Sequence, residues 1–340
     1  MVNYPPFRKP SLYITLPSDR MRGFSGVHPV YSMVTTDDFI IRTPDALLNG
    51  LATEKIIENC CPTIQDASEL SHCDTTYVLA SIKIASTGPF IEFHSNCQSC
   101  NVSLPCEVSI QSLISSITVE KWFDSLNLGE VTVRFQSPTY RNFTAFSIKD
   151  YQYTRQLYQI SKLESSEMYS EIIARLMEEK KQLLLAYHGS SIKEIFIKSN
   201  GVLVSEPKFI YEWFSKCDVD QQQKISQYIE QAIMQSKIPE TKIKCDECMR
   251  ENIIPIELDF CSVFRHRLIP KTEPEIMEEL NVMGEETKRL TNDILKMIWY
   301  MRGSVSYSEA MNLTFHERMC ISKIIEENIE ITKKIGMPFV

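Results

Sequence analysis

The chain has 340 residues, of which 43% are hydrophobic and 24% are charged. This composition is ordinary for a folded globular protein and excludes an intrinsically disordered chain. The formal net charge of −8 gives no overall basic field, so it argues against binding to nucleic acid or to an anionic membrane surface and favours protein partners.

The N-terminal residues and the cysteines indicate a reducing compartment. No window approaches 18 uninterrupted apolar residues, and residues 1–10 lack the apolar core of a signal peptide, so we expect a protein made and kept in a cytoplasm. The 11 cysteines fit reduced thiols, because the chain is long and their number is odd. Those outside any motif are expected to be buried as small apolar side chains, namely Cys60, Cys61, Cys73, Cys106, Cys217, Cys261 and Cys320.

Residues 1–45 predict an extended N-terminal arm with a small β element. They are rich in proline and short polar turns, and residues 12–16 alternate between apolar and polar side chains as a strand does. A helix is then predicted from about Thr43 to just before Pro62, because its leucines and isoleucines fall on one helical stripe.

A second helix is predicted to follow a short turn. Asp66 or Ser68 could cap its first residues, since both side chains accept hydrogen bonds from free backbone N–H groups. Gly88 is expected to end it.

The apolar period changes from helical to two around each of two Cys-x-x-Cys motifs, Cys97–Cys100 and Cys245–Cys248. Each motif therefore lies at the turn of a predicted β-hairpin. The flanking strand-like runs are residues 90–94, 102–110, 241–244 and 253–260. Two hairpins that each carry a Cys-x-x-Cys motif suggest one shared site.

The region between the hairpins is predicted to be mainly helical. It contains one probable strand at residues 131–135, a long helical stretch at about 150–187, and shorter helices at 206–215 and 220–235. We interpret residues 111–237 as a helical insertion.

The C-terminal part predicts two more helices. The first runs over about residues 275–300, and the second begins at Thr314, where Glu317 completes a capping box. Residues 299–301 are expected to pack inward, with an exposed docking patch as the alternative. The apolar tail at residues 337–340 could dock on a partner or on its own chain.

The four motif cysteines predict a metal site. Zinc prefers four thiolates in a tetrahedron, and a Cys-x-x-Cys at a hairpin turn presents two sulfurs, so Cys97, Cys100, Cys245 and Cys248 together complete one structural Zn²⁺ site. Metal-free hairpins, redox pairs and an iron–sulfur site are the alternatives. A closed four-sulfur shell has no open position for water, which argues against hydrolytic catalysis.

Details of the two turns affect this prediction. Zinc-binding turns often carry glycine after the second cysteine, but this chain has Asn101 and Met249 there. Asparagine tolerates a left-handed backbone and methionine does so poorly, so the second turn is expected to be distorted. His94 is interpreted as a strand residue, with a substitute ligand as the alternative.

The sequence contains no motif of catalysis. His-Glu-x-x-His, Gly-x-Ser-x-Gly and the glycine-rich nucleotide loops do not occur in it. The acidic pairs Glu178–Glu179 and Glu326–Glu327 are adjacent on predicted helices and do not face each other, so they read as solvated surface. We therefore expect no catalytic residue, no small-molecule substrate and no enzymatic activity.

A series of segments occurs in a familiar order along the chain. They are Leu16–Ser18, Pro44–Gly50, Cys60–Pro62, Ile82–Ser86, Cys97–Cys100, Cys245–Cys248 and Glu326–Phe339. In this order the chain resembles the baseplate hub subunit family of T4-type (myovirus) phages. The resemblance spans most of the chain but is weaker over the insertion, and Asp19–Arg22 departs from the family's glycine-rich opening.

The resemblance implies a virion protein of the central tail baseplate, assembled in the host cytoplasm, that contacts other baseplate and tail proteins. An assembly factor that leaves before the virion matures is the alternative. A zinc protein that binds nucleic acid would need basic and aromatic clusters around its cysteines. The loops read Gln98-Ser99 and Asp246-Glu247 instead, which favours protein contacts and no nucleic acid or membrane.

The predicted fold class is α+β. It is helix-rich, with two β-hairpin zinc knuckles forming one zinc-ribbon-like site of four cysteines, and with a C-terminal helical segment. We predict an N-terminal arm at residues 1–45, a core at 46–265 that contains the insertion, and a C-terminal helical segment with a docking tail at 266–340.

Overall fold

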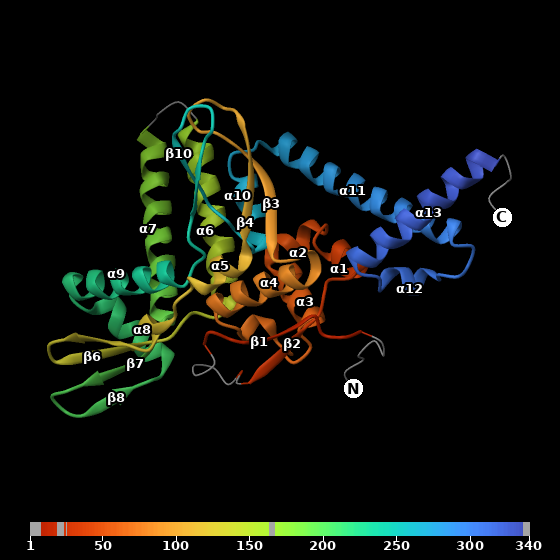
Figure 1. The fold of residues 1–340 in the computed structure, drawn as a ribbon. Helices are drawn as coiled ribbons and strands as arrows, with labels where there is room; N and C mark the ends of the chain where they lie inside the picture. Colours follow the sequence, from red (N-terminus) through yellow and green to blue (C-terminus); the bar gives the residue numbers. More distant parts are fainter. Residues whose placement is uncertain (1–7, 19–23, 25, 163–166, 336–340) are drawn as a thin grey trace.

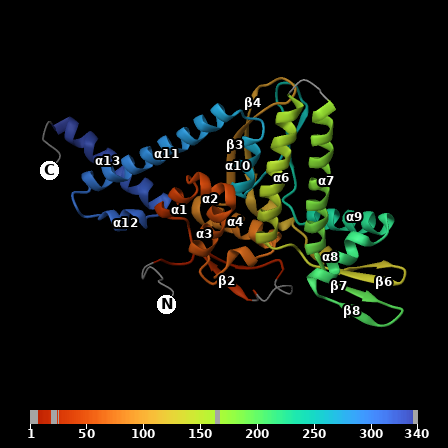
Figure 2. The ribbon, with the colours of Figure 1, turned by 180° about the vertical axis from the view of Figure 1, so that it is seen from behind.

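The computed structural model describes residues 8–18, 24, 26–162 and 167–335. A central helical body carries several extensions (Figure 1). A small sheet projects on one side, a helical arm on the opposite side, and a helix pair together with two β-hairpins extends from one end, as the view from behind also shows (Figure 2).

The body is built from a two-stranded antiparallel hairpin and a group of short helices. In the hairpin Leu12 pairs with Val30 and Thr15 with Val27, which confirms the predicted small β element. The elements of the body are β1 (Leu12–Thr15), β2 (Val27–Val30), α1 (Thr35–Ile40), α2 (Pro44–Asn49), α3 (Leu51–Cys60), α4 (His72–Thr87) and α5 (Ile110–Ser115).

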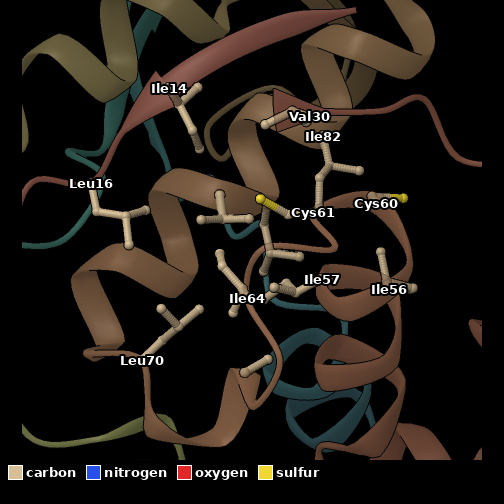
Figure 3. Packing of buried hydrophobic residues seen from close by; sticks show 13 residues of the cluster. Ile14, Leu16, Val30, Ile56, Ile57, Cys60, Cys61, Ile64, Leu70 and Ile82 are labelled. Atoms are coloured by element: carbon tan, nitrogen blue, oxygen red, sulfur yellow. The ribbon is translucent and has the colours of Figure 1, made fainter. Parts of the chain in front are cut away.

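The main hydrophobic core lies between this hairpin and the helices α3 and α4. Ile14 and Val30 from the hairpin point toward Ile57 and Ile82 from the two helices, with Ile64 from the connecting segment beneath them (Figure 3). All five side chains are buried. Burial of each such side chain contributes roughly 1.5–3 kcal/mol, so this cluster fixes the body.

The single helix predicted from Thr43 to Pro62 is divided at Gly50. This glycine has φ +87° and separates α2 from α3. A Cβ atom placed there would lie 2.8 Å from Cγ2 of Thr144, so both the backbone conformation and the close approach require glycine. The prediction of one helix is therefore wrong.

The start of α4 also differs from the prediction. Asp66 caps only a 3₁₀ turn at Ala67–Glu69, by accepting from the backbone N–H of Ser68. The cap of α4 is Ser71, whose Oγ accepts from the backbone N–H of Asp74 at 3.1 Å. The predicted end at Gly88 is confirmed.

Two antiparallel hairpins carry the Cys-x-x-Cys motifs, as predicted. The first consists of β3 (Phe90–Asn96) and β4 (Ser103–Ser109), and the second of β9 (Thr241–Lys244) and β10 (Glu251–Ile254). The strand predicted to reach Phe260 ends at Ile254 instead. At Phe260 the helix α10 (Phe260–Leu268) begins, because Asp259 caps it by accepting from the backbone N–H of Cys261.

The insertion contains more β structure than predicted. Its long helical stretch is two helices, α6 (Tyr140–Ser161) and α7 (Glu167–Ser190). Besides the predicted strand β6, the structure forms an antiparallel sheet of order β5-β6-β7-β8, packed against two helices by a core that contains Trp122 and Phe214. These elements are β5 (Ser125–Leu128), β6 (Val131–Phe135), β7 (Ile192–Ile197), β8 (Val202–Val204), α8 (Pro207–Lys216) and α9 (Val219–Gln235).

The C-terminal arm consists of α11 (Glu273–Tyr300), α12 (Tyr307–Met311) and α13 (Phe315–Ile335). The helices α11 and α13 cross and pack through Ile294 and Ile325, both buried. The predicted capping box is confirmed, since Glu317 Oε2 accepts from the backbone N–H of Thr314 at 2.7 Å. The predicted docking tail, residues 337–340, lies outside the described residues.

The predicted inward packing of residues 299–301 holds only for Met301, which contacts the core of the arm. Trp299 is 80% exposed, so the alternative of an exposed side chain is correct at that position. In all, the helix-rich body, the small antiparallel hairpins and the C-terminal helices confirm the α+β class. The predicted three-part division of the chain stays a prediction.

Candidate metal centre

The four predicted ligands come from the turns of the two hairpins. Cys97 and Cys100 lie between β3 and β4, and Cys245 and Cys248 lie between β9 and β10. Both hairpins rise to the same end of the molecule, the upper end in Figure 1. The folding of the body thus brings together two motifs that are far apart in the sequence.

The two turns have the same local geometry. The backbone N–H of Asn101 donates to the carbonyl of Cys97 at 2.9 Å, and the N–H of Met249 donates to the carbonyl of Cys245 at the same distance. Asn101 has φ +58° and Met249 φ +60°. The expected distortion at Met249 is therefore wrong: the second turn adopts the left-handed conformation with a side chain that disfavours it.

The sulfur atoms form a compact cluster. All four Sγ atoms lie within 4.8 Å of one another. The Sγ atoms of Cys97 and Cys248 are 3.6 Å apart, as are those of Cys100 and Cys245, so each short contact joins opposite hairpins. A tetrahedral zinc with Zn–S distances of about 2.3 Å requires sulfur separations of about 3.8 Å, which this cluster fits with small side-chain movements.

Backbone dipoles in the first turn stabilise a thiolate. The N–H groups of Cys100 and Ser99 point to Sγ of Cys97 and lower the pKa of that thiol to about 6. At Cys100 the N–H of Val102 lowers the pKa, but the neighbouring thiols, led by Cys97, outweigh it and raise the pKa to about 12. Thiols this close cannot all ionise without a cation among them, and a bound metal supplies that charge.

The cluster is closed on its inner side by apolar residues. Cys97 and Cys245 are buried, whereas Cys100 faces solvent. The side chains of Leu104 and Ile254, one from each hairpin, pack beneath the buried pair.

A residue that the sequence analysis did not identify also joins the hairpins. Asn252, on β10, accepts a hydrogen bond at Oδ1 from the backbone N–H of Gln98 at 2.9 Å. Its side chain is only 2% exposed. A polar asparagine directly before the apolar pair Ile253–Ile254 was the available signal, because a buried amide needs hydrogen-bond partners.

Comparison with known protein families gives a match. A family model described as "T4 bacteriophage base plate protein" matches residues 39–265, more than half of the chain. The chain belongs to this family. No curated protein and no solved structure matches it.

Membership of the base plate family indicates where the protein acts and what kind of partners it contacts. The matched region contains both Cys-x-x-Cys motifs and ends before α11 begins at Glu273. The family implies a role in the phage baseplate, a location in the virion tail baseplate and contacts with other phage structural proteins. None of the helices in the described ranges has the length and apolarity needed to cross a membrane.

The remaining residues named from the sequence of this base plate protein are not among the clustered ligand atoms, although Cys106 packs in the same apolar cluster as Cys97 and Cys245. His94 is exposed on β3 and is not among the clustered ligand atoms. Of the cysteines expected to be buried, Cys217 is half-buried and Cys320 is exposed, so the prediction fails at Cys320. Cys320 lies on the outer side of α13, where helical periodicity places it away from the packed Ile325.

Proposed function

We propose that this base plate family protein is a structural component of the hub region of a contractile tail, held together by one structural zinc ion. Cys97, Cys100, Cys245 and Cys248 would be the zinc ligands. The observation that carries the proposal is the cluster of four thiols at the turns of two hairpins, in a chain that belongs to this family.

Several features support a structural zinc over other uses of the cysteines. Four thiols fill a tetrahedral shell, so the ion would act as a cross-link and not as a catalyst. Redox Cys-x-x-Cys motifs lie at helix starts, whereas both motifs here connect antiparallel strands. When bound, zinc supplies positive charge for the thiolates, and its coordination free energy offsets the entropy of closing the long loop between the hairpins.

We propose that the protein acts through protein contacts and has no enzymatic activity, small-molecule substrate, nucleic acid or membrane partner. Large apolar side chains are exposed on the outward extensions. Trp299 and Leu295 lie on the arm, and Phe196 and Leu203 lie on adjacent strands of the sheet. Such side chains are typical of surfaces that become buried in an assembly.

We also propose that the predicted division at residues 45 and 265 separates parts with different roles. The core at 46–265 would hold the metal site, and the C-terminal segment at 266–340 would reach neighbouring subunits. The arm's own small core, around Ile294 and Met297, supports a semi-independent C-terminal unit.

The test of the proposed function is quantitative mass spectrometry of purified virions and of isolated tail assembly intermediates. A hub component is expected in both samples at a fixed ratio to other baseplate proteins. A protein found in intermediates but absent from virions would instead be an assembly factor made in the host cytoplasm. Absence from both samples would contradict a baseplate role of either kind.

A further inference from the structure

A groove lies where the body, the first Cys hairpin and the C-terminal arm meet. Residues of α4, α10, α11 and β3 line it, and its volume is about 610 Å³. This volume is large enough to take several side chains of a partner. None of the four cysteines lies in the groove, so it is distinct from the metal centre.

The walls of the groove are apolar and only partly buried. Ile91 and Phe93 contribute from β3, Phe260 and Val263 from α10, and Met283 from α11, and each is half-buried. Leaving this much contiguous apolar surface in water costs free energy that a bound partner would recover.

The rim carries positive charge that the protein itself does not neutralise. Lys83 on α4 and Arg267 on α10 both line the groove, and neither has an ion-pair partner within the described ranges of the chain. The chain as a whole carries a net charge of −8, so two free cations beside an apolar groove differ in sign from the charge of the whole molecule.

Most carboxylates on the same rim are already paired. Asp38 is paired with Arg318, Glu279 with Lys271, and Glu286 with Arg289. The fourth, Glu257, lies 3.5 Å from the ring of His266. The charge left available to a partner is therefore mainly positive, which selects a ligand with carboxylates beside its apolar face.

The described end of the arm leads away from the groove. Phe315, the first residue of α13, lines the groove, and the 21 residues of α13 extend from it to Ile335. A helix of that length is about 30 Å long, so its far end lies well away from the groove.

We propose that the groove binds an acidic amphipathic helix of another baseplate protein. A helix satisfies its own backbone hydrogen bonds, which suits walls built mostly from side chains of other helices. Its apolar face would contact Phe260 and Met283, and the carboxylates beside that face would pair with Lys83 and Arg267. This inference rests on the proposed function only for the source of the helix, not for its chemistry.

The test uses a fluorescein-labelled peptide of roughly 16 residues, about four helical turns, with leucines on one face and glutamates beside them. A second peptide has lysine in place of each glutamate. Fluorescence anisotropy with the full chain is expected to show at least tenfold tighter binding of the glutamate peptide. Equal affinities, or tighter binding of the lysine peptide, would overturn the proposal.

Variants locate the binding. The double variant Lys83→Glu/Arg267→Glu should weaken binding of the glutamate peptide at least tenfold and should improve binding of the lysine peptide. Val282→Asp, on the exposed groove wall of α11, should weaken both peptides. Lys208→Glu, an exposed control on α8, should leave both affinities unchanged. Unchanged affinities in the first two variants would overturn the proposal.

Self-association is the competing occupant. If sedimentation of the unliganded chain shows a dimer that Val282→Asp dissociates, the groove holds a second copy and the proposed partner helix is wrong. Zinc content and presence in virions are measured separately, so a failure of peptide binding leaves the proposed function standing. A chain absent from virions that still prefers the glutamate peptide would reject the function alone.

Discussion

Asn252 accepts a hydrogen bond from the backbone N–H of Gln98 at 2.9 Å, and so links the two Cys hairpins without using a sulfur atom. The same side chain lies within 3.3 Å of the carbonyl of Arg250, in its own hairpin. A buried amide therefore sets the relative position of the two hairpins, and the cysteines then complete the junction.

Replacement of Asn252 tests this link. Asn252→Ala leaves the N–H of Gln98 without its acceptor, so the free energy of unfolding should fall by about 1–3 kcal/mol. Urea denaturation measures the change. Gln98→Ala is the matched control, because it keeps the backbone N–H and removes an exposed side chain whose Nε2 lies a long 3.5 Å from the carbonyl of Ile253. Equal effects of the two variants would show that the backbone contact contributes little.

Loss of a single sulfur should be costly when that sulfur is a zinc ligand. Cys97→Ser should lower the midpoint of thermal unfolding and reduce solubility. The free energy of unfolding should fall by several kcal/mol, because the metal no longer holds the two hairpins together. Cys106→Ser, a buried cysteine of the adjacent strand β4, should cost only about 1 kcal/mol. A chelator should destabilise the Cys106 variant but not the Cys97 variant. A chelator effect of equal size on both would contradict the assigned ligands.

The left-handed backbone of Met249 should be a source of strain. Met249→Gly removes the Cβ atom at φ +60°, so the metal-loaded protein should gain about 1 kcal/mol of stability. Asn101→Gly should gain less, because asparagine tolerates this conformation. Chemical denaturation compares the two variants. A loss of stability in Met249→Gly would mean that its side chain makes contacts worth more than the strain.

The division between α2 and α3 depends on the space at Gly50. Gly50→Ala should cost about 2–4 kcal/mol, since it adds a clash with Thr144 to the penalty of a positive φ. Gly201→Ala has a positive φ of +67° and an open surrounding, so it should cost only about 1 kcal/mol. Adding Thr144→Ser to the Gly50 variant should recover part of the loss in a double-mutant cycle. Additive effects would rule out the clash.

Buried His188 should make stability depend on pH. Burial lowers the pKa of its ring to about 4, below the value of about 6.5 expected for the unfolded chain. The unfolded state therefore binds a proton first, so stability is complete above pH 6.5 and falls as the pH drops toward 4, by up to about 3 kcal/mol. His188→Gln should flatten this part of the curve of unfolding free energy against pH. Parallel curves for the two proteins would contradict it.

The sequence predicted the meeting of the four cysteines better than it predicted the insertion. The spacing within Cys97–Cys100 and Cys245–Cys248 is a local signal, and a hairpin turn is decided by a few residues, so the approach of the two motifs could be predicted. That they bind a metal ion stays a prediction. The sheet was missed because Ile192–Ile197 does not alternate strictly and its partner β6 lies far away in the chain. The pairings β5–β6 and β7–β8 are local hairpins, and the Asn200-Gly201 turn between β7 and β8 was a usable sequence signal.

Features that depend on tertiary contacts were likewise out of reach. Gly50 ends α2 in the left-handed conformation, and its close approach to Thr144 on a different helix could not be foreseen, so helix periodicity alone continued through it. The hydrogen bond of Asn252 required the two hairpins to be placed side by side first. Trp299 was expected to pack because aromatic residues at helix ends usually do, but it is not covered by any of the residues that the structure describes.

The most direct test of the central claim is the zinc content of the purified full chain, measured by native mass spectrometry alongside elemental analysis. The account predicts about one zinc ion per chain in the wild-type protein, and none in a variant with Cys97→Ser and Cys248→Ser. A wild-type protein that folds fully, stays soluble and carries no zinc would contradict it.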